Sequence, residues 1–407
     1  MNALPPSDPP PSRSTSTFTW GVSTSAYQIE GAVNDDGRGP SIWDIYSRLP
    51  GKIAGGDTGD IACDHYHRYR EDVALMQKLG IGAYRFSVAW PRVMPEGRGA
   101  VNEAGLAFYD RLIDSLIASG IEPWLCLYHW DLPQALQENG GWANRDCAQW
   151  FADYTDVIAR RYGDRVKRFA TFNEPSVFTL FAYCLGGQPP GIVDRAMLLR
   201  AIHHVNLGHG AAVDRLRAGV VDASLGAVHN CQPCRPATDK PEDRAASDML
   251  DAYWNGAYPD PQLRGFYPPL LAEAMTPYVK PGDLAQISRP VDWFGLNHYS
   301  LHYVVASDRN PLGLWFGGAE RRGARRVAHC LSQGLYRRDV RRDRGRRRRA
   351  RLFRLVTARQ FRMGLGLQPA LRAGLYGLSD AAPAAQGFIS LVCDVIKAHS
   401  VSSVPTV

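Results

Sequence analysis

The sequence predicts an α/β protein of the TIM (β/α)8 barrel class, and three observations lead to that prediction. Between Trp20 and Asn297, short apolar runs rich in β-branched and aromatic residues alternate with amphipathic helical patterns. A glycine separates each helical pattern from the strand that follows it. Strand, helix and strand repeated at this spacing are typical of parallel β/α units, and we favour a barrel over a doubly wound sheet. Neither G-x-G-x-x-G nor G-x-x-x-x-G-K follows a strand, which removes the usual nucleotide-binding interpretations.

Six strands are expected along this part of the chain, at 18–28, 83–90, 121–130, 165–175, 223–230 and 291–300. The helix after the first strand ends at Gly80, and its apolar residues are three or four positions apart, at Tyr66, Tyr69, Val73, Met76 and Leu79. The next helix begins after Asn102, a favourable N-cap, and ends at Gly120. A complete barrel has eight strands, so we predict that strands seven and eight are lost or scrambled in this chain.

Charge is unevenly distributed and divides the chain into segments. From Ala319 to the end there are 18 Arg and one Lys against five acids, a net charge of +14, whereas the preceding part has 28 bases and 35 acids, a net charge of −7. We expect four segments: a disordered leader at 1–17, the barrel with its first six strands at 18–316, an Arg-rich segment at 319–387 and a C-terminal tail at 388–407. The barrel is therefore acidic, and the basic character belongs to the tail.

The first seventeen residues, MNALPPSDPPPSRSTST, contain neither a basic n-region nor an apolar h-region. They predict a Pro/Ser-rich disordered leader and not a signal peptide. No apolar run approaches membrane-spanning length. The eight cysteines, set mostly singly in apolar stretches, indicate reduced and buried thiols. We therefore expect a cytoplasmic protein that does not interact with a membrane.

Two clusters allow a metal or redox interpretation. Cys231 and Cys234 have C-x-x-C spacing, but no second Cys/His pair follows at zinc-finger spacing, so an ordinary loop is favoured over a zinc or redox site. His203, His204 and His209 fit a helix and have no carboxylate beside them at ligand spacing. Packed or capping histidines are therefore favoured over a metal site. We expect no metal and no organic cofactor.

Polar residues follow the predicted strands at their carboxyl ends, where barrel enzymes place their active sites. These residues are Gln28, Arg85, His129, Trp130, Asn173, Glu174, Asn297 and Tyr299. Amide, imidazole and indole groups around a carboxylate suit a hydroxyl-rich ligand, because planar polar groups bind sugar hydroxyls in pairs and aromatic faces cover the sugar C–H surface. Glu30 and Asp131 border this set, and ordinary strand-end hydrogen bonding is the favoured role for both.

Five ordered motifs resemble the family 1 glycoside hydrolases, the β-glucosidase and β-galactosidase family of retaining TIM-barrel enzymes. The motifs are FTWGVSTSAYQIEG, YRFSVAWPRV, YHWDLPQAL, TFNEP and FGLNHYS, and they cover roughly residues 18 to 304 in the family order. The resemblance implies that Glu174 is the general acid/base. It also implies that the substrate hydroxyls are bound by Asn173, Gln28, His129, Trp130 and Asn297, and that the nucleophile is contacted by Arg85 and Tyr299.

The second catalytic carboxylate is missing from the sequence. Retention requires a carboxylic acid and, about 5 Å away, a carboxylate that attacks the anomeric carbon. The resemblance places that nucleophile in a Thr-Glu-Asn-Gly segment, and no such segment follows Tyr299. The family's eighth-strand motif, Trp-Ser-Leu-Leu-Asp-Asn-Phe-Glu-Trp, is absent too. We therefore predict a β-glucosidase-like retaining glycoside hydrolase, acting on terminal β-D-glycosyl residues, whose chain as written is inactive.

The Arg-rich segment offers a reason for these absences. Ten arginines lie between Arg337 and Phe353, and no lysine lies between Lys280 and Lys397. Back-translated and moved one base forward, residues 356–367 permit Ser-Leu-Leu-Asp-Asn-Phe-Glu-Trp-Ala-x-Gly-Tyr. Our hypothesis is that 319–387 is the family's C-terminal part in the wrong reading frame. The shifted frame does not restore the nucleophile, so a deletion or a falsely predicted intron that also broke the frame explains both facts.

Two other functions are left open. The chain is a non-catalytic sugar-binding pseudoenzyme if Gln28, His129 and Trp130 bind a sugar without catalysis. The Arg-rich segment is a nucleic-acid-binding arm in the third interpretation, which the frame-shift hypothesis disfavours. We expect a small-molecule β-glycoside or oligosaccharide as the partner and no nucleic acid. The choice among glucoside, galactoside and 6-phospho-sugar, the aglycone and the oligomeric state are not fixed by the sequence.

Overall fold

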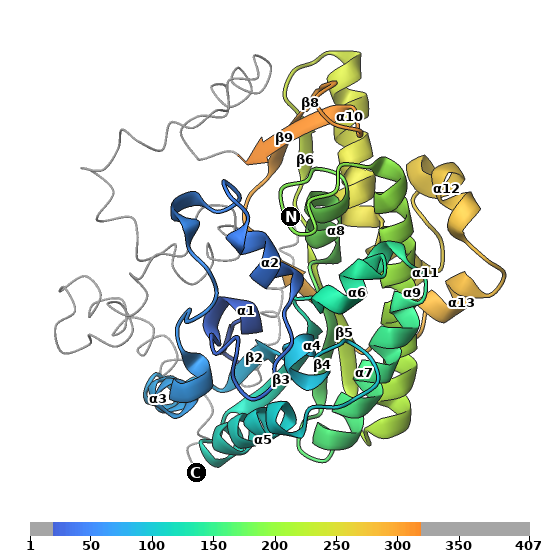
Figure 1. Cartoon of the computed structure of the whole chain (residues 1–407). Helices are drawn as coiled ribbons and strands as arrows, with labels where there is room; N and C mark the ends of the chain where they lie inside the picture. Colours follow the sequence, from blue (N-terminus) through green and yellow to red (C-terminus); the bar gives the residue numbers. More distant parts are fainter. Residues whose placement is uncertain (1–18, 319–407) are drawn as a thin grey trace, which may run out of the picture.

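The computed structural model describes residues 19–318 of the chain (Figure 1). The leader, the Arg-rich segment and the C-terminal tail expected from the sequence lie outside the described residues. The described part is built around a six-stranded sheet with the strand order β1-β2-β3-β4-β5-β7. Every neighbouring pair in this sheet is parallel, as expected for successive β/α units.

All six predicted strands are confirmed, and each is shorter than its apolar run because the flanking residues belong to loops or to the short helices that follow. The strands are β1 (Gly21–Ser23), β2 (Ala83–Ser87), β3 (Glu122–Tyr128), β4 (Arg168–Asn173), β5 (Ser224–Asn230) and β7 (Trp293–Asn297). The label β7 therefore denotes the sixth strand of the barrel sheet. The predicted TIM-barrel class holds for this part of the chain, which forms six consecutive barrel strands.

The sheet is curved, and two tryptophans show this. Trp124 on β3 and Trp293 on β7 are three strand spacings apart, which in a flat sheet corresponds to about 14 Å. Their ring centroids are nevertheless 5.4 Å apart. The two rings meet across the concave face, where Cys126, Ala170 and Val228 form a small apolar layer beneath them. This face is the interior of the partial barrel.

Helices cover the convex face of the sheet (Figure 1). The longest are α3 (His65–Lys78), α5 (Glu103–Ala118), α7 (Cys147–Tyr162) and α9 (Arg195–Gly219). Shorter helices fill the connections: α1 (Ala26–Ile29), α2 (Ile42–Arg48), α4 (Trp90–Val93), α6 (Gln134–Glu138), α8 (Pro175–Tyr183), α10 (Pro241–Asp251), α11 (Pro259–Arg264), α12 (Pro269–Met275), α13 (Asp283–Ile287), the 3-10 turns η1 (Ala54–Gly56), η2 (Gly141–Ala143) and η4 (Thr276–Tyr278), and the π-helical turn η3 (Ala252–Gly256).

The predicted helix boundaries agree with the structure to within two residues. Gly80 has φ +69°, the left-handed conformation that favours glycine after a helix. Asn102 occupies the N-cap position of α5, but its side chain does not cap the helix. Its amide instead donates to the carbonyl oxygens of Asp36 and Arg92, at 2.7 and 2.9 Å. The position was predicted correctly, and the capping bond was wrong because two loop carbonyls compete for the amide.

The three α9 histidines are packed, as predicted. His203 Nε2 lies 2.7 Å from Asp283 Oδ2, His204 Nδ1 lies 3.0 Å from the Trp142 carbonyl oxygen, and His209 Nδ1 lies 2.7 Å from Thr171 Oγ1. All three are buried. Within residues 19–318, no group of three or more His, Cys, Asp or Glu side chains is placed to hold a metal ion.

A second, smaller sheet was not predicted. It contains β6 (Cys234–Pro236), β8 (His302–Ala306) and β9 (Leu314–Gly318) in the order β6-β8-β9. Strands β6 and β8 follow closely after β5 and β7, so this sheet extends from the carboxyl edge of the barrel sheet (Figure 1). The runs are short, and β6 ends at a proline, which is why their sequence pattern was inconspicuous. Cys234 is placed in this sheet as a free thiol, and Cys231 is also free.

The barrel sheet has two open edges among the described residues, since β1 and β7 each pair with one neighbour. On the convex side of β7, Phe294 is 45% exposed and Leu296 is 60% exposed. An unpaired strand edge beside apolar side chains favours association between chains.

No helix of the described part is long and apolar enough to cross a membrane.

We predict that the substitution Leu296→Lys reduces self-association of the chain, because a charge at an open edge opposes edge-to-edge pairing. Sedimentation velocity would show a smaller fraction of large species than in the wild type. The control is Leu270→Lys, since Leu270 is 53% exposed but lies on α12, away from the sheet edge. A wild-type chain that is a soluble monomer with one sharp cooperative melt would contradict this prediction.

Candidate active site

The site is centred on Glu174, which follows β4 and precedes α8. Its backbone is left-handed, with φ 51° and ψ 58°, so the chain turns sharply between the strand and Pro175 at the start of the helix. The Glu174 N–H donates to the Val228 carbonyl oxygen at 2.7 Å, which ties this turn to β5. A left-handed non-glycine residue is uncommon and is held in place by such surroundings. The turn directs a fully buried carboxyl group to the carboxyl edge of the sheet.

Two amides from neighbouring strands donate to one oxygen of Glu174. Asn230 Nδ2 lies 3.0 Å and Asn297 Nδ2 lies 2.7 Å from Oε1. Asn230 and Asn297 are register partners in the β5–β7 pairing, so both side chains reach the carboxylate from the same level of the sheet. Oε2 is also buried and makes no hydrogen bond within the described part of the chain.

The environment of Glu174 favours the protonated form. Burial raises the pKa of its carboxyl group above the ordinary value, and the hydrogen bonds from Asn297 and Asn230 and the charge of Arg85 oppose that rise. Because Oε1 faces two N–H donors, a proton on this carboxyl belongs on Oε2. The arrangement is that of a carboxylic acid whose proton points away from its own hydrogen-bond donors.

Asn173 and His129 extend the network away from Glu174. Asn173 Oδ1 accepts from Asn297 Nδ2 at 3.3 Å, and Asn173 Nδ2 lies 3.1 Å from His129 Nε2. The Asn173 amide is a donor there, so His129 Nε2 accepts and the ring carries its proton on Nδ1. Burial, and secondarily the charge of Arg85, hold the pKa of His129 well below its usual range, so the imidazole is neutral.

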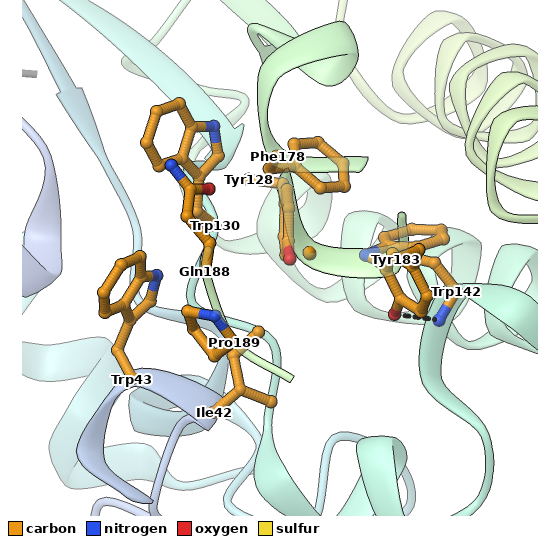
Figure 2. Close-up of a pocket in the computed structure, with 10 residues that line it drawn as sticks. Ile42, Trp43, Tyr128, Trp130, Trp142, Phe178, Tyr183, Gln188 and Pro189 are labelled. Atoms are coloured by element: carbon orange, nitrogen blue, oxygen red, sulfur yellow. Dashed lines mark hydrogen bonds between the residues drawn. The ribbon is translucent and has the colours of Figure 1, made fainter. Parts of the chain in front are cut away.

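Trp130 lies beside His129 at the edge of the candidate site. Its backbone is left-handed, with φ 79°, and its indole N–H donates to the Asn173 carbonyl oxygen at 2.8 Å. Figure 2 shows Trp130 and Trp43 on one side of a small aromatic-lined cavity, with Trp142 and Tyr183 on the other. The indole N–H, which the sequence offered as a hydroxyl-binding group, is therefore engaged by the backbone that carries Glu174.

The other predicted residues lie at the same edge of the sheet and differ in how they are connected to Glu174. Arg85 Nη2, on β2, lies 3.4 Å from Ser23 Oγ, and the guanidinium acts on Glu174 through its charge. Tyr299 is hydrogen-bonded to Glu174, and burial, followed by the charge of Glu174, raises the pKa of its hydroxyl group. Gln28 lies on α1 directly after β1, and its side chain makes no hydrogen bond to the other predicted site residues within 19–318. Hydrogen bonds thus join Glu174, Asn173, His129 and Asn297 and do not include Gln28.

Asn230 is the functional candidate that the sequence analysis missed. It is the last residue of β5 and is completely buried. Asn230 has the same sequence feature that selected the other residues, namely a polar side chain at the carboxyl end of a predicted strand.

The two bordering carboxylates behave differently. Glu30 is in a buried ion pair with Arg92 at 3.0 Å and accepts from the Tyr109 hydroxyl at 2.6 Å, which is the structural role predicted. The expectation was wrong for Asp131, which is fully buried and whose carboxyl oxygens make no hydrogen bond to another described residue. Burial, and then the charge of Glu30, raise the pKa of Asp131 to about 7, while Arg38 acts in the opposite direction.

The fold and the site together define a class: a β/α-barrel protein with a buried carboxylic acid, amides, an imidazole and an indole at the carboxyl edge. The Glycosyl hydrolase family 1 model matches residues 12–314. The chain belongs to glycosyl hydrolase family 1.

Individual relatives agree with this assignment. The chain is 46% identical over 305 residues to Beta-glucosidase A of Thermotoga maritima, covering 74% of this chain and 68% of the relative. It is 46% identical over 295 residues to Beta-glucosidase A of Acetivibrio thermocellus, covering 70% and 65%. A solved structure of the Thermotoga maritima β-glucosidase in complex with glucoimidazole is 43% identical, with a TM-score of 0.69 and coverage of 74% and 69%. The chain spans about two thirds of the length of these curated relatives.

We predict that Asp131→Asn stabilises the protein increasingly as the pH rises. Folded Asp131 keeps its proton to pH about 7, whereas its ordinary pKa is 3.8. Between these values the folded state binds more protons than the unfolded state, so this group makes stability fall with rising pH, by up to about 4 kcal/mol. The difference in Tm between Asp131→Asn and the wild type should therefore grow from pH about 4 to about 8.

The matched control is Asp239→Asn, because the Asp239 side chain is fully exposed. Its Tm difference from the wild type should be small and should not follow the same trend. A constant Tm difference for Asp131→Asn across this pH range would contradict the prediction.

Proposed function

We propose that residues 19–318 carry the acid/base and sugar-binding half of a retaining β-glycosidase site. The observation that carries this proposal is the Glu174 carboxyl group, with two amide donors on Oε1 and a buried Oε2. A general acid must hold its proton near neutral pH and present it to the leaving group. Burial supplies the raised pKa, and the two amides direct the proton to Oε2.

Glu174 has two tasks in this mechanism. As the glycosidic C–O bond breaks, the Oε2 proton passes to the leaving oxygen, while a second carboxylate forms a bond to the anomeric carbon. Glu174 then takes a proton from the water that releases the sugar, which restores its acid form. We assign Asn173 to the sugar 2-hydroxyl, and Gln28, His129 and Asn297 to the remaining hydroxyls. The Trp130 indole N–H already donates to the Asn173 carbonyl oxygen, so we assign the face of its ring to the sugar C–H surface. Arg85 and Tyr299 are assigned to the nucleophile's surroundings.

The proposed substrate is a small-molecule β-glycoside with a terminal β-D-glucosyl residue. Relatives that are 46% identical carry the name β-glucosidase, and a related structure contains glucoimidazole. The neutral His129 and the amide-rich surroundings of Glu174 support an uncharged, hydroxyl-rich ligand.

We propose that the chain as written does not hydrolyse glycosides, because the family's nucleophile segment is absent from its sequence. A non-catalytic sugar-binding function is the alternative, and the hydrogen-bonded set of Glu174, Asn173, His129 and Asn297 supports it. The two functions require different measurements, one of turnover and one of binding.

The expected result with an aryl β-glucoside is no release of the aryl alcohol above the level of a Glu174→Gln control. Glucose or glucoimidazole should raise Tm if the sugar-binding half is functional, since a ligand that binds only the folded state stabilises it. Stabilisation without hydrolysis supports the sugar-binding alternative, and the absence of both effects removes it. Hydrolysis that Glu174→Gln abolishes would show that a nucleophile is present and contradict the proposed inactivity.

Resequencing the coding DNA and transcript from about codon 300 tests the proposed origin of the Arg-rich segment. If a falsely predicted intron broke the frame, the correct sequence should show an uninterrupted frame that encodes Thr-Glu-Asn-Gly followed by Trp-Ser-Leu-Leu-Asp-Asn-Phe-Glu-Trp. That result would make Glu174 the acid/base of an ordinary retaining β-glycosidase. An unchanged sequence would contradict a falsely predicted intron and leave the printed chain without a nucleophile.

A further inference from the structure

The amide of Asn230 is held in one orientation by two groups that do not touch Glu174. Asn230 Oδ1 accepts from Gln232 Nε2 at 2.9 Å and from the Trp254 indole N–H at 3.3 Å. Asn230 Nδ2 donates to Glu174 Oε1 at 3.0 Å. A reversed amide would place its NH2 group against two N–H donors and its carbonyl oxygen against Oε1, so three contacts would become repulsive at once.

Gln232 is itself fixed at both ends. Its backbone N–H donates to Asn255 Oδ1 at 3.0 Å, and its carbonyl oxygen accepts from Asn255 Nδ2 at 2.9 Å. Its side-chain Oε1 accepts from the backbone N–H and the hydroxyl of Ser300, at 3.1 and 3.0 Å. Since Oε1 is committed to Ser300, Nε2 must point to Asn230. The direction of this amide is therefore set by groups on two other segments of the chain.

The surroundings make these hydrogen bonds strong determinants of orientation. Gln232 is 2% exposed and Trp254 is 1% exposed, and Asn230 is completely buried. Water does not compete for the amide groups there, and an unsatisfied buried donor or acceptor is costly. The chain of donors runs in one direction, from Gln232 and Trp254 to Asn230 and from Asn230 to Glu174.

We infer that Gln232 and Trp254 are positioning residues that act through Asn230 to orient the Glu174 carboxyl group, with Oε1 as hydrogen-bond acceptor and Oε2 as the oxygen that carries the proton. This inference rests on the proposed function only in that Glu174 is named the acid/base. The orientation itself is a property of the chain without substrate. It assigns a role to two residues outside the motifs that indicated the site.

The test is the titration of Glu174 in the full chain, monitored by NMR of glutamate side chains whose carboxyl carbons are labelled with 13C. The chain has ten glutamates, and the signal of Glu174 is the one that Glu174→Gln removes. Gln232→Met and Trp254→Phe each remove one donor to Asn230 without adding a charge. The Asn230 amide then loses its preferred orientation, and the pKa of Glu174 should move upward because its charged form loses a hydrogen bond.

A double-mutant comparison separates positioning from a general structural effect. With Asn230→Ala in place, adding Gln232→Met should leave the Glu174 titration unchanged, because the connecting amide is gone. The matched control is Ser300→Ala, since Gln232 Oε1 keeps the backbone N–H of residue 300 as a donor. The Gln232 side-chain amide therefore keeps its orientation toward Asn230. This variant should titrate like the wild type.

The inference is overturned if folded Gln232→Met and Trp254→Phe both titrate like the wild type. It is also overturned if Gln232→Met shifts the titration equally in the wild-type background and in the Asn230→Ala background. If Gln232→Met does not fold, Trp254→Phe alone, with and without Asn230→Ala, decides the question. Absence of glycoside hydrolysis or of ligand binding would bear on the proposed function and would not alter these titrations.

Discussion

The site depends on the register in which β5 pairs with β7. That register sets Asn230 opposite Asn297, and both amides reach the same oxygen of Glu174. If β7 slipped by one residue, the Asn297 amide would turn to the convex face and only the Asn230 amide would remain, because side chains alternate along a strand. The left-handed turn at Glu174 places a carboxyl group in a fully buried position. That buried carboxyl group depends on the two amide donors for its hydrogen bonds. Curvature completes the arrangement by bringing β7 toward β4.

The sequence was sufficient for the barrel strands and for the centre of the site, because both follow from repeated local patterns. Alternating strand and helix periods located all six strands, and polar residues at their ends located Glu174, Asn173 and Asn297. The hydrogen-bond partners of individual side chains were less predictable. The Asn102 amide donates to loop carbonyls, and the Trp130 indole donates to the backbone of Asn173. Both outcomes depend on groups distant in sequence, which local patterns do not specify.

Neighbouring carboxyl groups in this edge of the molecule have different roles because their partners differ. Glu30 is compensated by Arg92 and by the Tyr109 hydroxyl, so its buried charge has partners on both oxygens. The Asp131 carboxyl group is buried without a hydrogen-bond partner among the described residues, and its pKa rises instead. Glu174 lies between these cases, with donors on one oxygen only. Burial alone therefore does not distinguish Glu174 from Asp131; the distribution of donors over the two carboxyl oxygens does.

The acid/base half and the nucleophile half of the proposed site are separable in the fold. Both amide donors to Glu174 Oε1 come from strands that end by Asn297, and the residues that orient Asn230 lie between 232 and 300. The orientation of the Glu174 carboxyl group is thus determined by one continuous part of the chain, in which each strand is held by pairing with its neighbour. A chain that lacks the second carboxylate can for this reason keep a correctly oriented acid. The surroundings of Glu174 support the acid/base half of the proposed site, whereas turnover requires the second carboxylate as well.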